Sequence, residues 1–225
     1  AVCRIYENKR RKRTTWLYKC SSWKLFISKE TFKKIASSGF KIKKLDFKTA
    51  QAYAKGGNHQ GFLLDIKEYE FKDLHTLKKG EFIAILYGIS DVGNIGAIVR
   101  TAYALGVDGL IFIGERLAME GVIRTSSGAA LDLEIALNND IFTVLNELKQ
   151  VGFKLFASAS GGKQIYHYKV DKGKKALILG SEGLGLSAKI IKKCDECVGI
   201  EMKNNFDSLN VSVAFAILCD RMINA

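Results

Sequence analysis

The amino-acid sequence predicts an α/β protein, in which a small basic α/β domain precedes a C-terminal domain built on a parallel sheet. Three observations support this prediction. Strand-like and helix-like segments alternate from Glu81 onward. The strand-like segments are short continuous apolar runs, as expected for strands that are buried on both faces. The excess of positive charge is confined to the first third of the chain.

The first domain is predicted to span residues 1–66. Its polar stretch Glu7–Thr15 is interpreted as a basic arm, and the glycines around His59 predict a turn. A lone histidine in such a turn forms hydrogen bonds more often than it catalyses, because no acid or nucleophile stands at a useful spacing. Apolar runs at 23–27, 40–45 and 61–66 and helices at 30–36 and 49–54 are predicted.

A charged segment at 67–80 is predicted to be a linker, because it shows no strong hydrophobic period. Residues 81–225 then form the second domain, where alternating strands and helices predict a parallel sheet covered on both faces. The predicted strands are 82–87, 109–113, 133–137 and 153–158, and the predicted helices are 94–105, 121–127 and 141–151.

The rest of this domain is organised by the stretch from Lys175 to Val213. Ala176–Leu179 is predicted to be a buried strand. The glycines that follow it, at 180, 183 and 185, allow a tight turn whose backbone can approach a ligand closely. Because open α/β sheets bind ligands at the carboxyl ends of their strands, a nucleotide-sized site is expected here.

A second apolar run, Cys197–Met202, leads through a polar loop into the last helix. That helix is predicted at Leu209–Ile223, with Asp207 or Ser208 as its N-cap. It is apolar on most faces and is therefore expected to be buried.

Charge is distributed unevenly along the chain. Residues 1–80 hold 20 Lys and Arg against 7 Asp and Glu, whereas residues 81–225 hold 15 against 16. Aromatic residues such as Trp16 and Trp23 lie among the basic ones, which favours a polyanion-binding module with RNA or DNA as its partner. No apolar run is long enough to span a bilayer and no signal-peptide pattern is visible, so a cytoplasmic protein without a membrane partner is expected.

Five cysteines at irregular spacing favour reduced thiols over a disulfide framework. Cys194 and Cys197 form a single C-x-x-C pair, and the histidines are distant in sequence, so no metal site is expected. A redox role for the pair stays open, although two plain thiols at a helix-to-strand junction are favoured.

The segment DVGNIGAIVRTAYALGV places Asn94 and Arg100 six residues apart. From the residues alone, Arg100 is interpreted as half of a buried ion pair, because it interrupts an apolar helix, and Asn94 is interpreted as a helix cap. The turn GSEGLG is not in the order of a dinucleotide-binding loop, so a Rossmann-type dehydrogenase is disfavoured.

Together, four segments resemble the three sequence motifs of the SpoU/TrmH branch of the SPOUT methyltransferases. The segments are DVGNIGAIVRTAYALGV, TSSGA at Thr125–Ala129, LILGSEGLGLS and IEMKNNFDSLNVSVA, in the family's order over residues 82–225. In addition, GGNHQG after a small basic domain resembles the members that methylate a guanosine ribose 2′-hydroxyl in large-subunit (23S) ribosomal RNA. Their N-terminal domain is similar to a ribosomal-protein α/β fold.

The resemblance implies S-adenosylmethionine as the methyl donor, a homodimer with the active site near its interface, and a trefoil knot. Periodicity could not predict a knot, because knots are nearly absent from proteins. Glu201 stands where many relatives have proline, which implies a less rigid adenine loop. The implied catalytic residues are Asn94, Arg100, Glu182, Ser208 and Asn210, and the implied cofactor-binding residues are Gly180, Ser181, Gly183, Ile200, Met202 and Leu209, with Ser158, Ala159 and Ser160 beside them.

The expected reaction is an in-line displacement that gains mainly from the alignment of its two reactants. A guanidinium gives up its proton reluctantly, so Arg100 is expected to clamp a neighbouring RNA phosphate and stabilise the developing alkoxide. Ser208 and Asn210 are expected to position the phosphate, the arginine or the ribose by hydrogen bonds. Glu182 is expected to accept from a backbone or Asn donor and hold its loop.

Alternative functions remain open from the sequence. A tRNA guanosine 2′-O-methyltransferase, or an enzyme whose product confers antibiotic resistance, would have a similar catalytic half. A knotted RNA-binding protein without activity belongs to a different class, and a methyl-transfer assay would distinguish it from an enzyme.

Overall fold

The computed structural model describes residues 16–20, 33, 37, 41–54, 62–65, 69–167, 173–204 and 207–224. The chain divides into two compact units, Ala1–Glu70 and Phe71–Ala225. The predicted basic arm, the apolar run at 23–27 and the turn around His59 lie outside the described residues, as does most of the predicted helix at 30–36. No helix in the part of the chain that the structure describes is long and apolar enough to cross a bilayer.

The N-terminal unit contains a three-stranded sheet with the strand order β2-β1-β3. The central strand β1 pairs in parallel with β2 and antiparallel with β3. Asp46 caps the helix that follows β2 by accepting a hydrogen bond from the backbone amide of Thr49 at 2.9 Å. The elements are β1 (Trp16–Cys20), β2 (Lys41–Leu45), α3 (Phe47–Tyr53) and β3 (Phe62–Asp65).

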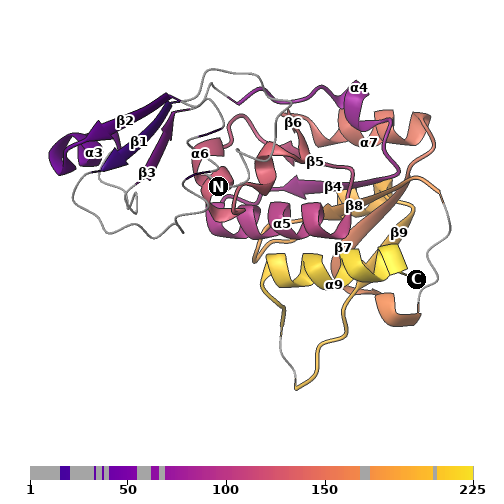
Figure 1. Ribbon diagram of the computed structural model, residues 1–225. Coiled ribbons are helices and arrows are strands. Elements are labelled where there is room, and N and C mark those ends of the chain that lie inside the picture. The colour runs from indigo at the N-terminus through magenta and orange to yellow at the C-terminus, as the bar shows by residue number, and fades with distance from the viewer. Residues whose placement is uncertain are drawn as a thin grey trace. The chain divides into compact units, whose positions relative to one another are not determined.

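The centre of the C-terminal unit is a six-stranded sheet with the order β6-β5-β4-β8-β7-β9 (Figure 1). All of its strand pairs are parallel, which confirms the parallel sheet predicted from the continuous apolar runs. The strands are β4 (Phe82–Tyr87), β5 (Gly109–Ile113), β6 (Glu134–Asn138), β7 (Lys154–Gln164), β8 (Lys175–Leu179) and β9 (Glu196–Gly199).

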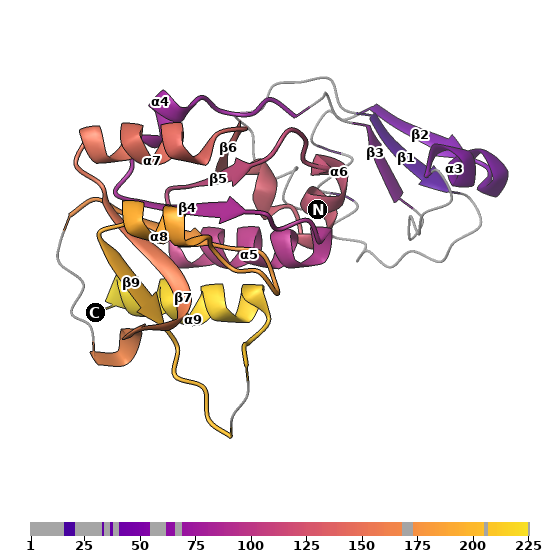
Figure 2. The same cartoon turned by 180° about the vertical axis from the view of Figure 1, so that it is seen from behind.

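Helices cover both faces of this sheet (Figures 1 and 2). On one face α5 lies against α6 and α9. On the other face, side chains of α4, α7 and α8 share one apolar core with alternate residues of the strands. The elements are α4 (Leu74–Leu77), α5 (Val92–Leu105), α6 (Met119–Thr125), α7 (Ile141–Gln150), α8 (Ala188–Lys193) and α9 (Val211–Asn224), with short 3₁₀ turns η1 (Ala129–Leu131) and η2 (Ile165–His167).

Helix α4 lies inside the charged segment that showed no period in the sequence. Asp73 caps it by accepting from the Thr76 amide at 2.7 Å, and Leu77, which is only 3% exposed, joins the core of the C-terminal unit. A helix of barely one turn is too short to produce a hydrophobic period, which explains why the sequence pattern did not reveal it. This part of the segment therefore belongs to the fold of the C-terminal unit.

Helix α9 differs from its prediction in two respects. It begins at Val211, and Asn210, not Asp207 or Ser208, caps it: the Asn210 backbone carbonyl accepts the first helical bond and its side chain accepts from the Ser212 amide at 2.9 Å. The helix is also not buried all round, because Val213 is 47% exposed in the single chain. A helix that lies on one face of a sheet buries only the stripe that faces the sheet.

Candidate functional site

The glycine turn after β8 folds back on itself. Ser181 and Gly185 pair across the turn, and the Gly185 amide donates to the Ser181 carbonyl at 2.9 Å. A side chain at Gly180 would overlap the backbone of Gly185, so this position accepts only glycine without a shift of the loop. Gly183 and Gly185 adopt left-handed backbone angles, φ 93° and 62°, that residues with a Cβ rarely adopt.

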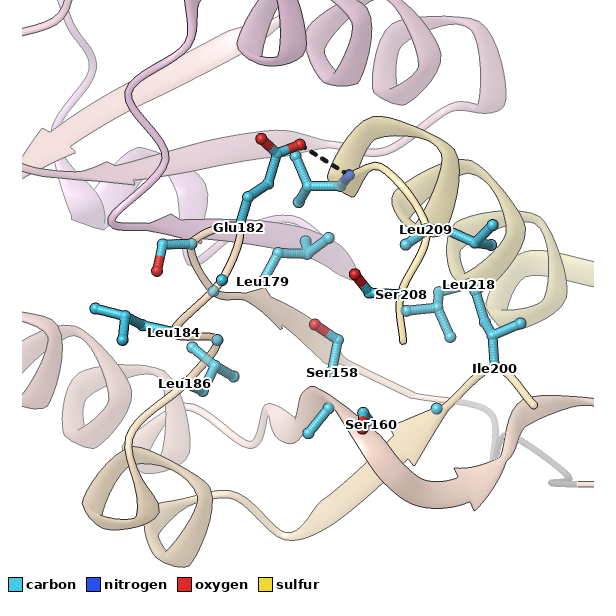
Figure 3. A pocket seen from close by; sticks show the side chains of 18 of the residues that line it. Ser158, Ser160, Leu179, Glu182, Leu184, Leu186, Ile200, Ser208, Leu209 and Leu218 are labelled. Carbon is cyan, nitrogen blue, oxygen red and sulfur yellow. Dashed lines mark hydrogen bonds between the residues drawn. The ribbon is translucent and has the colours of Figure 1, made fainter. Parts of the chain in front are cut away.

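This turn forms one wall of a pocket of about 520 Å³ at the carboxyl ends of β8 and β9 and beside the middle of β7 (Figure 3). The first turns of α9 close another side, and apolar side chains such as Leu179 and Leu218 lie between the polar groups. The residues that the resemblance assigned to cofactor binding all line this pocket: Ser158, Ala159, Ser160, Gly180, Ser181, Gly183, Ile200, Met202 and Leu209. Glu182 and Ser208, from the predicted catalytic set, line it as well.

Gly199, at the end of β9, is a pocket residue to which the sequence analysis gave no role. A Cβ at this position would lie 2.6 Å from the carbonyl oxygen of Ala159, so only glycine lets β9 approach the middle of β7 this closely. A glycine inside an apolar run is the signal that could have identified it, because such glycines often mark a close approach of two backbones.

Three polar side chains from distant parts of the chain meet beside the pocket. Glu182 accepts hydrogen bonds at its Oε1 atom from Asn94 Nδ2 at 3.0 Å and from Asn210 Nδ2 at 3.1 Å. The backbone amide of Val211 also donates to this oxygen at 3.3 Å (Figure 3). Asn210 Nδ2 donates in addition to Asn94 Oδ1 at 2.9 Å. Glu182 thus accepts from Asn and backbone donors, as the sequence analysis expected.

The strand order brings these residues together. β4 pairs directly with β8, so the loops that leave their carboxyl ends are neighbours. A Cβ added to Gly88 after β4 would lie 3.3 Å from the Cβ of Ser181 after β8, which is close contact. Asp91 caps α5 through the amide of Asn94 at 2.7 Å, so Asn94 is not the cap and its side chain is directed to Glu182 instead.

The donor and acceptor capacity of Asn210 is fully used within the protein. Its two side-chain N–H groups have two acceptors, Asn94 and Glu182. Its side-chain oxygen accepts from both the amide and the hydroxyl of Ser212, at 2.9 and 2.6 Å. An amide with four such partners orients its neighbours and has no remaining group for a ligand.

Arg100 lies on the exposed side of α5, so its interpretation as half of a buried ion pair is wrong. No ion pair of Arg100 occurs among the residues that the structure describes, and Arg100 Nη1 donates instead to the hydroxyl of Ser127 at 3.4 Å. Arg100 does not line the pocket of Figure 3. In the described chain, the structure therefore joins Asn94, Glu182 and Asn210, whereas Arg100 is bonded to a residue that the sequence analysis left without a role.

The two cysteines of the C-x-x-C pair, Cys194 and Cys197, are half-buried free thiols. Burial raises the pKa of the Cys194 thiol to about 11 and also raises the pKa of the Cys197 thiol. The Cys194 thiol donates a hydrogen bond to the Ile190 carbonyl, with 3.4 Å between sulfur and oxygen. Within the described ranges there is no group of three or more His, Cys, Asp or Glu side chains that could hold a metal ion.

Residues 81–220 match the model of the SpoU rRNA Methylase family. A protein of Borreliella burgdorferi named as an uncharacterized tRNA/rRNA methyltransferase is 34% identical over 206 residues, which cover 85% of this chain and 90% of that protein. The putative TrmH family tRNA/rRNA methyltransferase YacO of Bacillus subtilis is 30% identical over 172 residues, 72% of this chain and 69% of that one. The crystal structure of an AdoMet-bound rRNA methyltransferase from Sinorhizobium meliloti has the same fold, with a TM-score of 0.75 at 20% identity, and the match covers 95% of this chain and 81% of that one.

Proposed function

Because the chain belongs to the SpoU rRNA methylase family, we propose that it transfers a methyl group from S-adenosylmethionine to a ribose 2′-hydroxyl of RNA. One observation carries this proposal: the polar cluster of Asn94, Glu182 and Asn210 is built on the rim of the glycine-lined pocket. Glu182 lines the pocket and also accepts a hydrogen bond from Asn94, in the first turn of α5, the helix that carries Arg100. A donor site and a substrate site can therefore be held in one fixed geometry.

The pocket residues fit the methyl donor. A volume of about 520 Å³ lies within the range of roughly 300–1,000 Å³ that is common for small-molecule sites. The glycine turn and the hydroxyls of Ser158 and Ser160 offer hydrogen-bonding groups to a nucleoside, and the half-buried Ile200, Met202 and Leu209 offer apolar surface to its ring. When bound, S-adenosylmethionine supplies a methyl group that is activated by a positively charged sulfur.

Arg100 is the residue that we assign to the RNA side of the reaction. Its guanidinium is exposed and unpaired with any carboxylate in the described chain, and its planar fork matches a phosphate group. We assign it to the phosphate next to the target ribose, where it also stabilises negative charge on the 2′-oxygen as the hydroxyl proton passes to solvent.

The other members of the catalytic set divide into two roles. Ser208 lines the pocket and is exposed, so its hydroxyl is placed for contact with the substrate. Asn210 has no free donor or acceptor, and we assign it with Asn94 and Glu182 to positioning the two loops and the start of α9. This assignment replaces the expectation that Asn210 contacts the phosphate or the ribose.

We propose a guanosine in large-subunit (23S) ribosomal RNA as the substrate, with a tRNA guanosine as the alternative. The relatives that match this chain are named as tRNA/rRNA methyltransferases, which supports an RNA substrate of either class. Mapping of 2′-O-methyl groups in RNA from cells with and without the protein tests both. We expect one guanosine in 23S rRNA to lose its methyl group. Loss only in tRNA would favour the alternative, and no loss in either RNA would refute the proposed function.

The basic N-terminal domain, predicted at residues 1–66 with a linker at 67–80, is assigned to binding this RNA. Within residues 1–80, the 20 Lys and Arg outnumber the 7 Asp and Glu, and phosphate contacts by such residues supply much of the affinity for RNA. We place this reaction in the cytoplasm.

The proposal also includes a homodimer and a trefoil knot. Val213 and Ile223 of α9 are 47% and 36% exposed in the single chain, and a second copy that covers them would remove apolar surface from water. One feature supports the knot. After the edge strand β9, the chain returns toward the centre of the sheet, where α9 packs against α5, the helix that follows the central strand β4. Light scattering tests the dimer: Val213→Glu should halve the measured mass, and a monomeric unmodified protein would refute it.

A further inference from the structure

Ser127 occupies an unusual backbone conformation beside Arg100. It lies in the turn between α6 and η1, and its φ of 54° is in the left-handed region that a residue with a Cβ seldom adopts. The next residue, Gly128, is also left-handed, with φ 86°. The Ser127 hydroxyl is exposed at this point, where it accepts a hydrogen bond from Arg100 Nη1 at 3.4 Å. Glycine would fit this backbone more easily, but it would offer no hydroxyl.

The turn that carries Ser127 is fixed to the helix that carries Arg100. Gly96 of α5 lies so close to Thr125 of α6 that an added Cβ would overlap the threonine side chain. Thr125 Oγ1 is 2.9 Å from the Gly121 carbonyl of its own helix and 3.0 Å from the Val92 carbonyl of α5. The contacts of Thr125 with α5, two residues before Ser127, therefore set the position of the Ser127 hydroxyl relative to that helix.

Arg100 has a long side chain with many rotamers and lies on an exposed helix face. Without a partner, such a side chain would lose considerable conformational freedom each time it bound a phosphate. A hydrogen bond from its guanidinium to a fixed acceptor removes part of that freedom before the substrate arrives, which is how preorganised groups accelerate a reaction.

We propose that Ser127 is a positioning residue: its hydroxyl holds the Arg100 guanidinium in the orientation that methyl transfer requires. This inference rests on the proposed function, because it gives Arg100 a role in the reaction. Ser127 acts only through Arg100 and does not contact the methyl donor.

Two substitutions separate this role from a purely structural one. Ser127→Ala removes the hydroxyl and keeps the backbone strain, whereas Ser127→Gly removes the hydroxyl and relieves the strain. A positioning role predicts that both lower kcat roughly tenfold, the effect of losing one hydrogen bond to a charged group. A structural role predicts that the glycine variant is at least as active as the unmodified protein. The substrate for this assay is RNA from cells that lack the protein.

Rescue and a direct measurement complete the test. Ser127→Asn offers an acceptor oxygen and tolerates a left-handed backbone, so it should recover much of the lost rate. The NMR order parameter of the Arg100 Nε–H group should fall in the alanine and glycine variants and stay unchanged in the control Arg124→Ala, which removes an exposed arginine from α6.

The possible outcomes are distinguishable. Full activity in the glycine variant, or an Arg100 order parameter that does not respond to Ser127, would overturn the positioning role. If the unmodified protein methylates no RNA at all, the proposed function fails, whereas the order parameter still reports whether Ser127 orients Arg100.

Discussion

Asn94 and Asn210 are 116 positions apart in the chain, yet Asn210 Nδ2 donates to Asn94 Oδ1 at 2.9 Å. The same Nδ2 group also donates to Glu182 at 3.1 Å, so three loops are connected through two amides and one carboxylate. This arrangement couples the first turn of α5, the glycine turn after β8 and the first turn of α9. A substitution that moves any of these segments should therefore also change the shape of the pocket.

The first prediction concerns Arg100. Arg100→Ala should retain affinity for S-adenosylmethionine, because Arg100 does not line the pocket, but should lower methyl transfer at least about a hundredfold, since a charge-stabilising group is lost. Calorimetric titration with the donor and tritium transfer to RNA measure the two effects. Arg116→Ala, at an exposed arginine after β5, is the charge-matched control and should have a much smaller effect. Near-normal turnover of the Arg100 variant would exclude the proposed role.

The second prediction concerns Glu182, whose single oxygen Oε1 accepts three hydrogen bonds. Glu182→Ala should lower the free energy of unfolding by about 1 kcal/mol, because the donors of Asn94 and Asn210 lose their acceptor at a solvent-exposed site. Glu182→Gln keeps one acceptor oxygen and should lose less. Denaturant unfolding compares the variants, and equal stability of all three proteins would contradict this account of the cluster.

The third prediction concerns the basic residues of the N-terminal unit. Removal of residues 1–70, which keeps α4 with the C-terminal unit, should flatten the dependence of RNA affinity on salt, because this segment holds 17 Lys and Arg against 6 Asp and Glu. Each lost phosphate contact makes the negative slope of log K against log salt shallower by about 0.7 to 0.9. Replacement of Arg10, Arg11, Lys12 and Arg13 by glutamine in the full chain is the milder variant and should change the slope in the same direction. An unchanged slope in both would place the RNA contacts elsewhere.

The fourth prediction concerns pH and the Cys194 thiol, whose pKa burial raises to about 11. At pH 8 a thiol with this pKa is only about 0.1% thiolate, so alkylation should be roughly a hundredfold slower than for a thiol with the ordinary value of 9.0. Peptide mass spectrometry after iodoacetamide treatment measures the rate. Rapid labelling of Cys194 at neutral pH would contradict the burial argument.

The same shift fixes the sign of a stability change. Above pH 9 the unfolded chain releases thiol protons that the folded protein retains, so the unfolded state binds fewer protons and stability falls as pH rises toward 11. Cys219, whose pKa burial raises to about 12, adds to this loss. Cys194→Ser should reduce the alkaline loss of stability, and denaturant midpoints at pH 7 and pH 10.5 measure it.

Several features of the fold follow from local sequence patterns. The strands at Phe82–Tyr87 and Gly109–Ile113 have the bounds that their continuous apolar runs predicted, because strands buried on both faces leave little room for polar residues. The patterns predicted less well those elements that are very short or that bury only one face. The four-residue helix α4 was missed, and α9 was predicted to be buried although it exposes Val213.

For the candidate site, too, the sequence predicted one part and the tertiary structure was needed for the other. The sequence alone determined the glycine turn at Gly180–Gly185, because glycines at a strand end are a local property of the chain, whereas the other pocket residues were named through the family resemblance and Gly199 was not named at all. Only the tertiary structure decided which polar side chains meet: the pairing of β4 with β8 joins Asn94 to Glu182, and the packing of Gly96 against Thr125 sets Ser127 beside Arg100. Such contacts depend on strand order and helix packing across dozens of residues, which no local pattern contains.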